Sequence, residues 1–123
     1  VFKGIDSLRS TFEDGTRVNG IITKGGETSN IIPDYAAAEF TLRAKTRDDL
    51  KNVADKIITL TKTSELMIGA VPSFEKSMIY AERYPNMVIA EQFKENMSFF
   101  GEEFNYPSPD MKLGSSDIGN VSM

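Results

Sequence analysis

Residues 35–44 alternate between apolar and polar side chains, and this pattern constrains the fold more than any other feature of the 123-residue chain. One face of the predicted strand carries Ala38, Phe40 and Leu42, and the other carries Glu39, Thr41 and Arg43. Successive side chains of a strand point to opposite faces. The segment therefore predicts a sheet with one buried face and one polar face.

A helix is predicted directly after this strand. It begins at Thr46, with Asp49 three residues later in the position of a capping box. Its apolar stripe consists of Leu50, Val53, Ala54, Ile57 and Leu60. Gly69 and Pro72 are typical of a helix end. This stripe gives the helix one face with which to cover the apolar side of the sheet.

Three more elements complete the first part of the chain. Residues 1–12 predict an amphipathic helix that ends before Gly15, and residues 18–24 and 73–84 predict two further strands. The order of helix, strand, strand, helix and strand indicates the α+β class. We expect a two-layer sandwich, an antiparallel sheet with helices on one face and water on the other.

Composition changes near Pro85, where we place a boundary between residues 1–84 and residues 85–123. The second part predicts one amphipathic helix that ends at Gly101, followed by a loop rich in Gly and Ser. A helix is already under way at residue 1, and the other end stops within the loop-like stretch. We therefore expect a piece of a larger protein, with both of its domains incomplete.

Several classes of function are excluded by composition. The chain contains no Cys and no His, so it offers no thiol nucleophile, no Ser-His-Asp triad and no His-containing zinc site. Any metal bound by this chain would need a shell of oxygen ligands alone. Its net charge is -4 and no basic stripe stands out, so nucleic acid is not an expected partner. No apolar run approaches the roughly 20 residues that a membrane span needs.

Four polar residues are candidates for a functional site, and each also has a structural interpretation. Asn30 either bonds its own loop backbone or contacts a ligand. Arg43 is either a solvated sheet residue or a clamp that holds a carboxylate with two hydrogen bonds. Asp117 and Asn120 lie either in a flexible end or in an active-site loop. The residue chemistry alone leaves these alternatives open.

Three stretches together resemble one family. They are residues 25–36 (GGETSNIIPDYA), residues 43–44 (RA) and residues 114–122 (GSSDIGNVS). In this order and at this separation they resemble the metal-dependent amidohydrolases and carboxypeptidases of peptidase family M20. That family includes aminobenzoyl-glutamate hydrolase, the aminoacylases and the folate-cleaving carboxypeptidase.

The resemblance implies a lid and dimerisation domain over residues 1–84, followed by the start of the return into a catalytic domain. Such a lid has ferredoxin-like order, and its first strand is absent here. We expect the strand 73–84 either to close directly on 35–44 or to borrow a strand from elsewhere. The full-length enzyme is expected to hold two divalent metals, zinc or manganese, through residues outside this chain. The resemblance therefore implies no catalytic residue and no metal ligand in this chain.

The same resemblance assigns roles to the candidate residues. Asn30 and Arg43 are expected to contact a small, carboxylate-bearing amide substrate, and Asp117 and Asn120 to border the active site. We expect a cytoplasmic homodimer joined through the edge strand 18–24 and helped by helix 1–12. The full-length parent is expected to hydrolyse an N-acyl amino acid or a small peptide, whereas this chain alone is expected to be inactive.

Two alternatives carry no hydrolytic activity. One is a stand-alone α+β module that binds a ligand or another protein. The other is a small-ligand sensor of ferredoxin-like type that binds carboxylates through Arg43.

Overall fold

The computed structural model describes residues 1–103 and 116–121. Its elements are α1 (Phe2–Leu8), a short 3-10 helix (Arg9–Thr11), β1 (Arg17–Lys24), β2 (Ala37–Arg43), α2 (Arg47–Ile68), α3 (Met87–Phe99) and α4 (Ile118–Val121). The chain divides into two compact units, Val1–Ser77 and Met78–Met123. The mixture of helices with an antiparallel sheet confirms the α+β class. The domain boundary at Tyr84–Pro85 stays a prediction.

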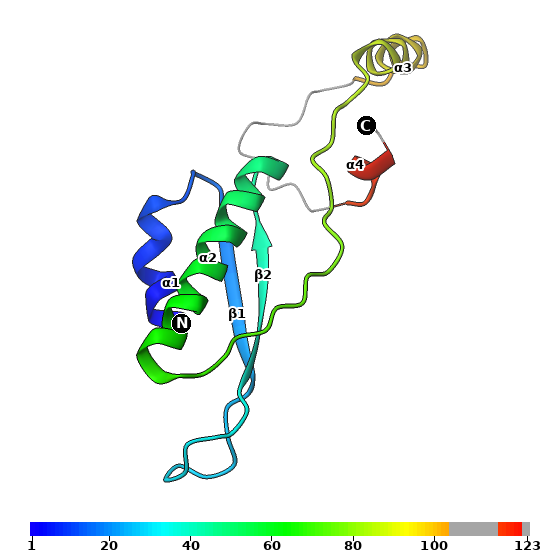
Figure 1. Ribbon diagram of the computed structural model, residues 1–123. Helices are drawn as coiled ribbons and strands as arrows, with labels where there is room; N and C mark the ends of the chain where they lie inside the picture. Colours follow the sequence, from blue (N-terminus) through cyan, green and yellow to red (C-terminus); the bar gives the residue numbers. More distant parts are fainter. Residues whose placement is uncertain (104–115, 122–123) are drawn as a thin grey trace. The chain divides into compact units, whose positions relative to one another are not determined.

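The first unit has two layers, a hairpin of β1 and β2 and a layer formed by α1 and α2 (Figure 1). The strands are antiparallel, and Val18 pairs with Leu42 while Gly20 pairs with Phe40. Between Ile22 and Lys24 the register shifts at an irregularity. Both strands agree closely with the predicted strands 18–24 and 35–44, because period-two patterning directly reports a half-covered strand.

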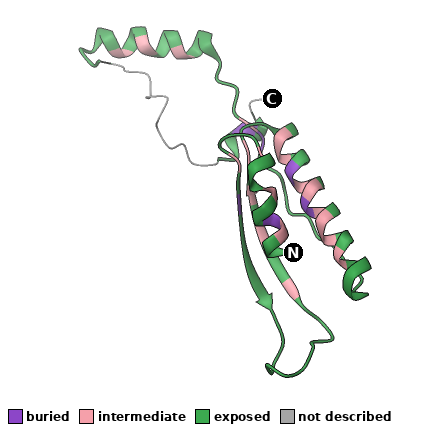
Figure 2. Cartoon of the chain, turned by 90° about the vertical axis from the view of Figure 1, so that its left-hand side faces the viewer, coloured by how far each residue is buried: buried purple, intermediate pink, exposed green. Residues whose placement is uncertain are grey.

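The core of this unit lies between the sheet and the two helices (Figure 2). Its buried side chains are Ile5 from α1, Val18 from β1, and Val53 and Ile57 from α2. Phe12, Phe40, Leu42 and Leu60 pack around them and are partly buried. Each buried aliphatic side chain contributes about 1.5–3 kcal/mol through its removal from water. The opposite face of the sheet is exposed, as the alternation at residues 35–44 predicts.

Helix α2 begins and ends as its sequence predicts. The Oγ1 atom of Thr46 accepts a hydrogen bond of 3.1 Å from the backbone N–H of Asp49, and it donates one of 2.7 Å to the Asp49 carboxylate. Gly69 ends the helix in a left-handed conformation with φ of 72°, and its N–H bonds to the carbonyl of Glu65. A left-handed end of this kind favours Gly, which has no Cβ to clash.

The predicted third strand at 73–84 is wrong. Residues 69–86 contain no helix or strand, and the described residues form a sheet of β1 and β2 alone. The segment therefore does not close on β2, and it pairs with no strand among the described residues of this chain. Alternation predicts extended backbone, but a strand also requires a neighbour for its hydrogen bonds. Here the backbone near Ala81 bonds instead to the side chain of Asn120.

The second unit contains α3 and α4. The side-chain oxygen of Asn86 caps α3 by accepting hydrogen bonds from the N–H groups of Val88 and Ile89, at 3.1 and 3.3 Å. The helix ends before Gly101, whose φ of 80° is left-handed, so the predicted stop at this residue is confirmed. Among the helices described, none combines the length and the hydropathy that crossing a bilayer requires.

Candidate functional site

Arg43 is the last residue of β2 and lies on the open face of the sheet, which is the face that α1 and α2 do not cover. Its neighbour Leu42 packs on the core, so the side chain of Arg43 points to the side away from the helices. Arg43 is exposed, and its side chain makes no hydrogen bond or ion pair with another described residue. Its guanidinium is therefore available to an external anion.

Arg17 pairs directly with Arg43 in the register of the hairpin. It precedes the buried Val18, so it also lies on the open face, and it too is exposed. The next pair on this face is Asn19 with Thr41. This end of the open face thus presents two guanidinium groups, an amide and a hydroxyl. We did not predict a role for Arg17, although aligning the buried positions of the two strands identifies it as the partner of Arg43.

Asn30 lies in the exposed loop that joins β1 to β2, at the end of the hairpin away from Arg43 (Figure 1). The six residue steps from Ala37 to Arg43 span about 20 Å at the usual rise of a strand. The structure therefore does not bring Asn30 and Arg43 of one chain together. In the loop, Gly26 adopts a φ of 116°, a conformation that favours Gly.

Asn120 lies in α4, where both halves of its side-chain amide contact the chain's own backbone. Its oxygen accepts a hydrogen bond of 2.6 Å from the N–H of Ala81, and its nitrogen donates one of 3.4 Å to the carbonyl of Ile79. Gly119 is buried, and a Cβ at this position would collide with the carbonyl of Ala81. These contacts hold α4 against residues 79–81.

Asp117 precedes α4 and is exposed, and its backbone carbonyl accepts a hydrogen bond of 2.9 Å from the N–H of Asn120. Of the motif 114–122, residues 114, 115 and 122 lie outside the described part of the chain. The assignment of Asp117 and Asn120 to a loop that borders an active site stays a prediction.

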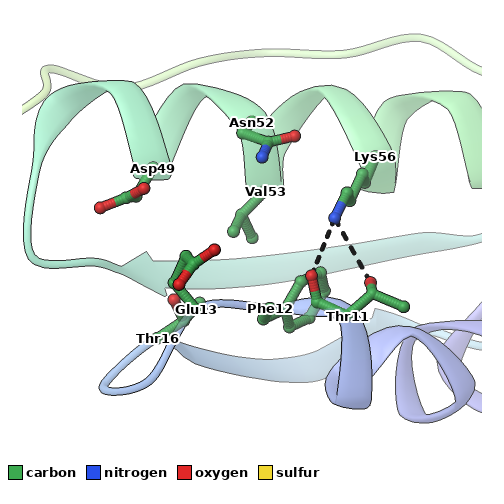
Figure 3. Close-up of a pocket in the computed structure, with 8 residues that line it drawn as sticks. All are labelled: Thr11, Phe12, Glu13, Thr16, Asp49, Asn52, Val53 and Lys56. Carbon is green, nitrogen blue, oxygen red and sulfur yellow. Dashed lines mark hydrogen bonds between the residues drawn. The ribbon is translucent and has the colours of Figure 1, made fainter.

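A small pocket lies on the helix side of the sheet, between the turn after α1 and the first turns of α2 (Figure 3). It is lined by Thr11, Phe12, Glu13, Thr16, Asp49, Asn52, Val53 and Lys56. Its free volume is ≈ 10 Å³, which is about enough for one water molecule. Nζ of Lys56 donates hydrogen bonds of 3.0 and 3.3 Å to the carbonyl and the hydroxyl of Thr11. The pocket is therefore part of the contact between α2 and the turn.

A larger hollow of ≈ 250 Å³ lies where α1 meets β1. It is lined by Phe2, Ile5, Asp6, Arg9, Val18, Asn19, Gly20 and Phe40. Arg9 donates a hydrogen bond of 3.1 Å to the carbonyl of Val18 and pairs with Asp6 at 2.9 Å. Arg9 directly follows α1 and does not belong to the hairpin. We infer that the Val18 carbonyl, which bonds to Arg9, points to the outer edge of β1, away from β2.

The donor set of the chain does not favour a metal centre. The sequence lacks His and Cys, and within residues 1–103 and 116–121 no three acidic side chains come together. Oxygen ligands alone suit hard cations such as calcium, but such a site needs six or more of them. The described residues therefore do not provide a site that fits a divalent ion.

Comparison with known proteins supports one family. A family model described as a peptidase dimerisation domain matches residues 3–66. Over 129 residues, the chain is 30% identical to the Xaa-Arg dipeptidase of Mus musculus, and the match covers 98% of this chain but 29% of that protein. The Xaa-Arg dipeptidase of Homo sapiens is 29% identical over 126 residues, which cover 98% of this chain and 28% of that protein. The chain spans less than a third of the length of these curated relatives.

The matched residues 3–66 include most of α1, both strands and most of α2, which together form the two-layer unit with the open sheet face. The chain therefore belongs to the M20 peptidase family, and residues 3–66 form its peptidase dimerisation domain.

Proposed function

We propose that this chain is the dimerisation and substrate-contacting part of a metal-dependent amidohydrolase that cleaves an N-acyl amino acid or a dipeptide. The observation that carries the proposal is Arg43, an exposed guanidinium with no partner among the described residues. A guanidinium binds a carboxylate through two parallel hydrogen bonds. The relatives named Xaa-Arg dipeptidase act on dipeptides by their names, and a dipeptide ends in such a carboxylate.

The reaction itself is assigned to residues outside this chain. The chain has no His and no Cys, and its described residues offer no fitting metal site. The role of Arg43 is to bind the carboxylate end and thereby to orient the scissile amide. Orientation of this kind lowers the barrier because a bound, aligned substrate has already lost its freedom to rotate.

The dimerisation domain implies that the protein self-associates. We propose a homodimer in which the outer edge of β1 and helix α1 form the contact. Backbone N–H and C=O groups of one residue point to the same side of an antiparallel strand, and the side alternates along the strand. If the carbonyl of Val18 faces the outer edge, then Gly20 and Ile22 also present their backbone groups there. A second copy of β1 can pair with these groups.

Asn30 is proposed to contact substrate that is bound to the other copy. The roughly 20 Å between the loop and the end of β2 exceeds the length of an extended dipeptide, about 7 Å. Asn30 and Arg43 of one chain therefore cannot both touch one dipeptide in this arrangement. A dimer supplies a second Asn30, whose amide offers both a donor and an acceptor to the substrate.

The proposal is tested by Arg43→Gln in the full-length protein. We expect kcat/KM for a dipeptide to fall roughly tenfold to a hundredfold, because a charged hydrogen-bond pair is lost. The matched control is Lys51→Gln, which removes an exposed positive charge on α2. Equal activity of both variants, or a full-length protein that hydrolyses neither dipeptides nor N-acyl amino acids, contradicts the proposal.

A further inference from the structure

The open face of the sheet carries two arginines in one cross-strand pair. Arg17 and Arg43 are registered opposite each other, and both lie on the face that no helix covers. Like charges in this position repel and destabilise a sheet. Neither side chain has a hydrogen bond, an ion pair or a ring contact with another residue in the part of the chain that the structure describes.

The rest of this face does not neutralise the pair. The adjacent pair, Asn19 with Thr41, is uncharged. The acid on this face of β2 is Glu39, four residues before Arg43, which corresponds to about 13 Å along the strand. The register thus concentrates positive charge at one end of the open face, although the chain as a whole has a net charge of -4.

Two guanidinium groups suit one carboxylate. Its two oxygens provide about four lone-pair sites, and each guanidinium presents a planar fork of N–H donors. Binding of the anion also reduces the repulsion between the two cations. The second arginine therefore supplies further hydrogen-bond donors and also makes binding of an anion more favourable.

We propose that Arg17 is a second carboxylate-binding residue, which holds the carboxylate of the substrate together with Arg43. This inference rests on the proposed function of Arg43 and adds a specificity role for a residue on the neighbouring strand. Molecules with a free carboxylate bind at this end of the face, and those whose carboxylate is replaced by a neutral amide do not.

The test compares hydrolysis of one dipeptide with hydrolysis of the same dipeptide as its C-terminal amide, using full-length protein. The measured quantity is the ratio of the two kcat/KM values. We expect Arg17→Gln to lower this ratio about tenfold, and Arg17→Lys to lower it less because the charge remains without the fork. Lys51→Gln, on the helix layer, leaves the ratio unchanged. A purely structural effect of Arg17 would change both substrates equally.

The two proposals fail in different ways. If Arg43→Gln lowers the ratio and Arg17→Gln does not, the role of Arg17 is overturned and that of Arg43 stands. If neither variant lowers it, the open face does not bind the carboxylate. If the protein hydrolyses neither substrate, calorimetric titration measures instead whether it binds N-acetylglycine, N-acetylglycinamide or inorganic phosphate. Binding of N-acetylglycine that depends on Arg17 supports the inference, and binding of phosphate alone overturns it.

Discussion

The ring of Phe40 on β2 lies over the backbone of Gly20 on β1, in the space that a side chain at position 20 would occupy. The two residues are cross-strand partners, and the absence of a Cβ allows the ring to approach the backbone of β1 closely. The same ring packs against Phe2 of α1, with 5.1 Å between the ring centroids. One glycine thus allows an aromatic contact between the sheet and the first helix.

We expect Gly20→Ala to lower the free energy of unfolding by about 1–3 kcal/mol, because the new methyl group displaces the Phe40 ring. Urea denaturation of the full-length protein measures the change. The control is the double variant Gly20→Ala with Phe40→Leu, in which the smaller side chain leaves room for the methyl group. If the double variant is destabilised by the sum of the two single effects, the steric explanation is wrong.

Co-expression of Asn30→Ala and Arg43→Gln chains tests whether Asn30 acts on the other copy. If it does, a mixed dimer has one site with both residues intact and one with neither. We then expect the mixed dimer to recover up to about half of the wild-type activity, whereas each variant alone is impaired. Activity of the mixed dimer that merely averages the two variants shows that Asn30 and Arg43 act within one chain.

Pairing along the outer edge of β1 is tested by Ile22→Pro. If the N–H of Ile22 faces outward, Pro removes a donor from the edge and leaves the bonds between β1 and β2 in place. We expect the protein to become monomeric in analytical ultracentrifugation while its circular dichroism spectrum is retained. Thr63→Ala, at an exposed position on α2, is the control and keeps the dimer. A folded Ile22→Pro protein that remains dimeric excludes this edge.

Asn120→Ala tests the contact between α4 and residues 79–81. Because the side-chain oxygen of Asn120 accepts a hydrogen bond from the N–H of Ala81, its loss exposes this amide to solvent. We expect faster hydrogen exchange at Ala81 in Asn120→Ala and no change in Asp117→Ala, since Asp117 is exposed and contacts α4 through its backbone. Unchanged exchange at Ala81 would assign Asn120 a role other than holding this segment.

Local signals predicted the first unit well. The hydroxyl of Thr46 and the left-handed Gly69 delimit α2 because caps depend on a few neighbouring residues. The alternation around Phe40 predicted β2 and its two faces, since a strand that packs on one side must repeat every second residue. The buried Val53 and Ile57 belong to the predicted stripe of this helix.

Features that depend on distant partners were not predictable in this way. The segment around Ala81 has strand-like alternation, but its backbone bonds to Asn120, which is 39 residues away. The pairing of Arg17 with Arg43 depends on the register of the hairpin, which neither strand specifies alone. The separation of Asn30 from Arg43 similarly follows from the length of β2, because Asn30 lies in the loop before this strand and Arg43 lies at its far end.

The core of the first unit contains four buried side chains, while Ile22 on β1 and Ile32 in the loop keep 64% and 91% of their surface exposed. The heat-capacity change of unfolding scales with the apolar surface that becomes hydrated, so this unit alone would unfold with a small heat-capacity change. Any surface covered by a second copy adds to that change, and mass action then makes the midpoint rise with concentration. Calorimetric scans at several protein concentrations would therefore report assembly and folding as one linked equilibrium.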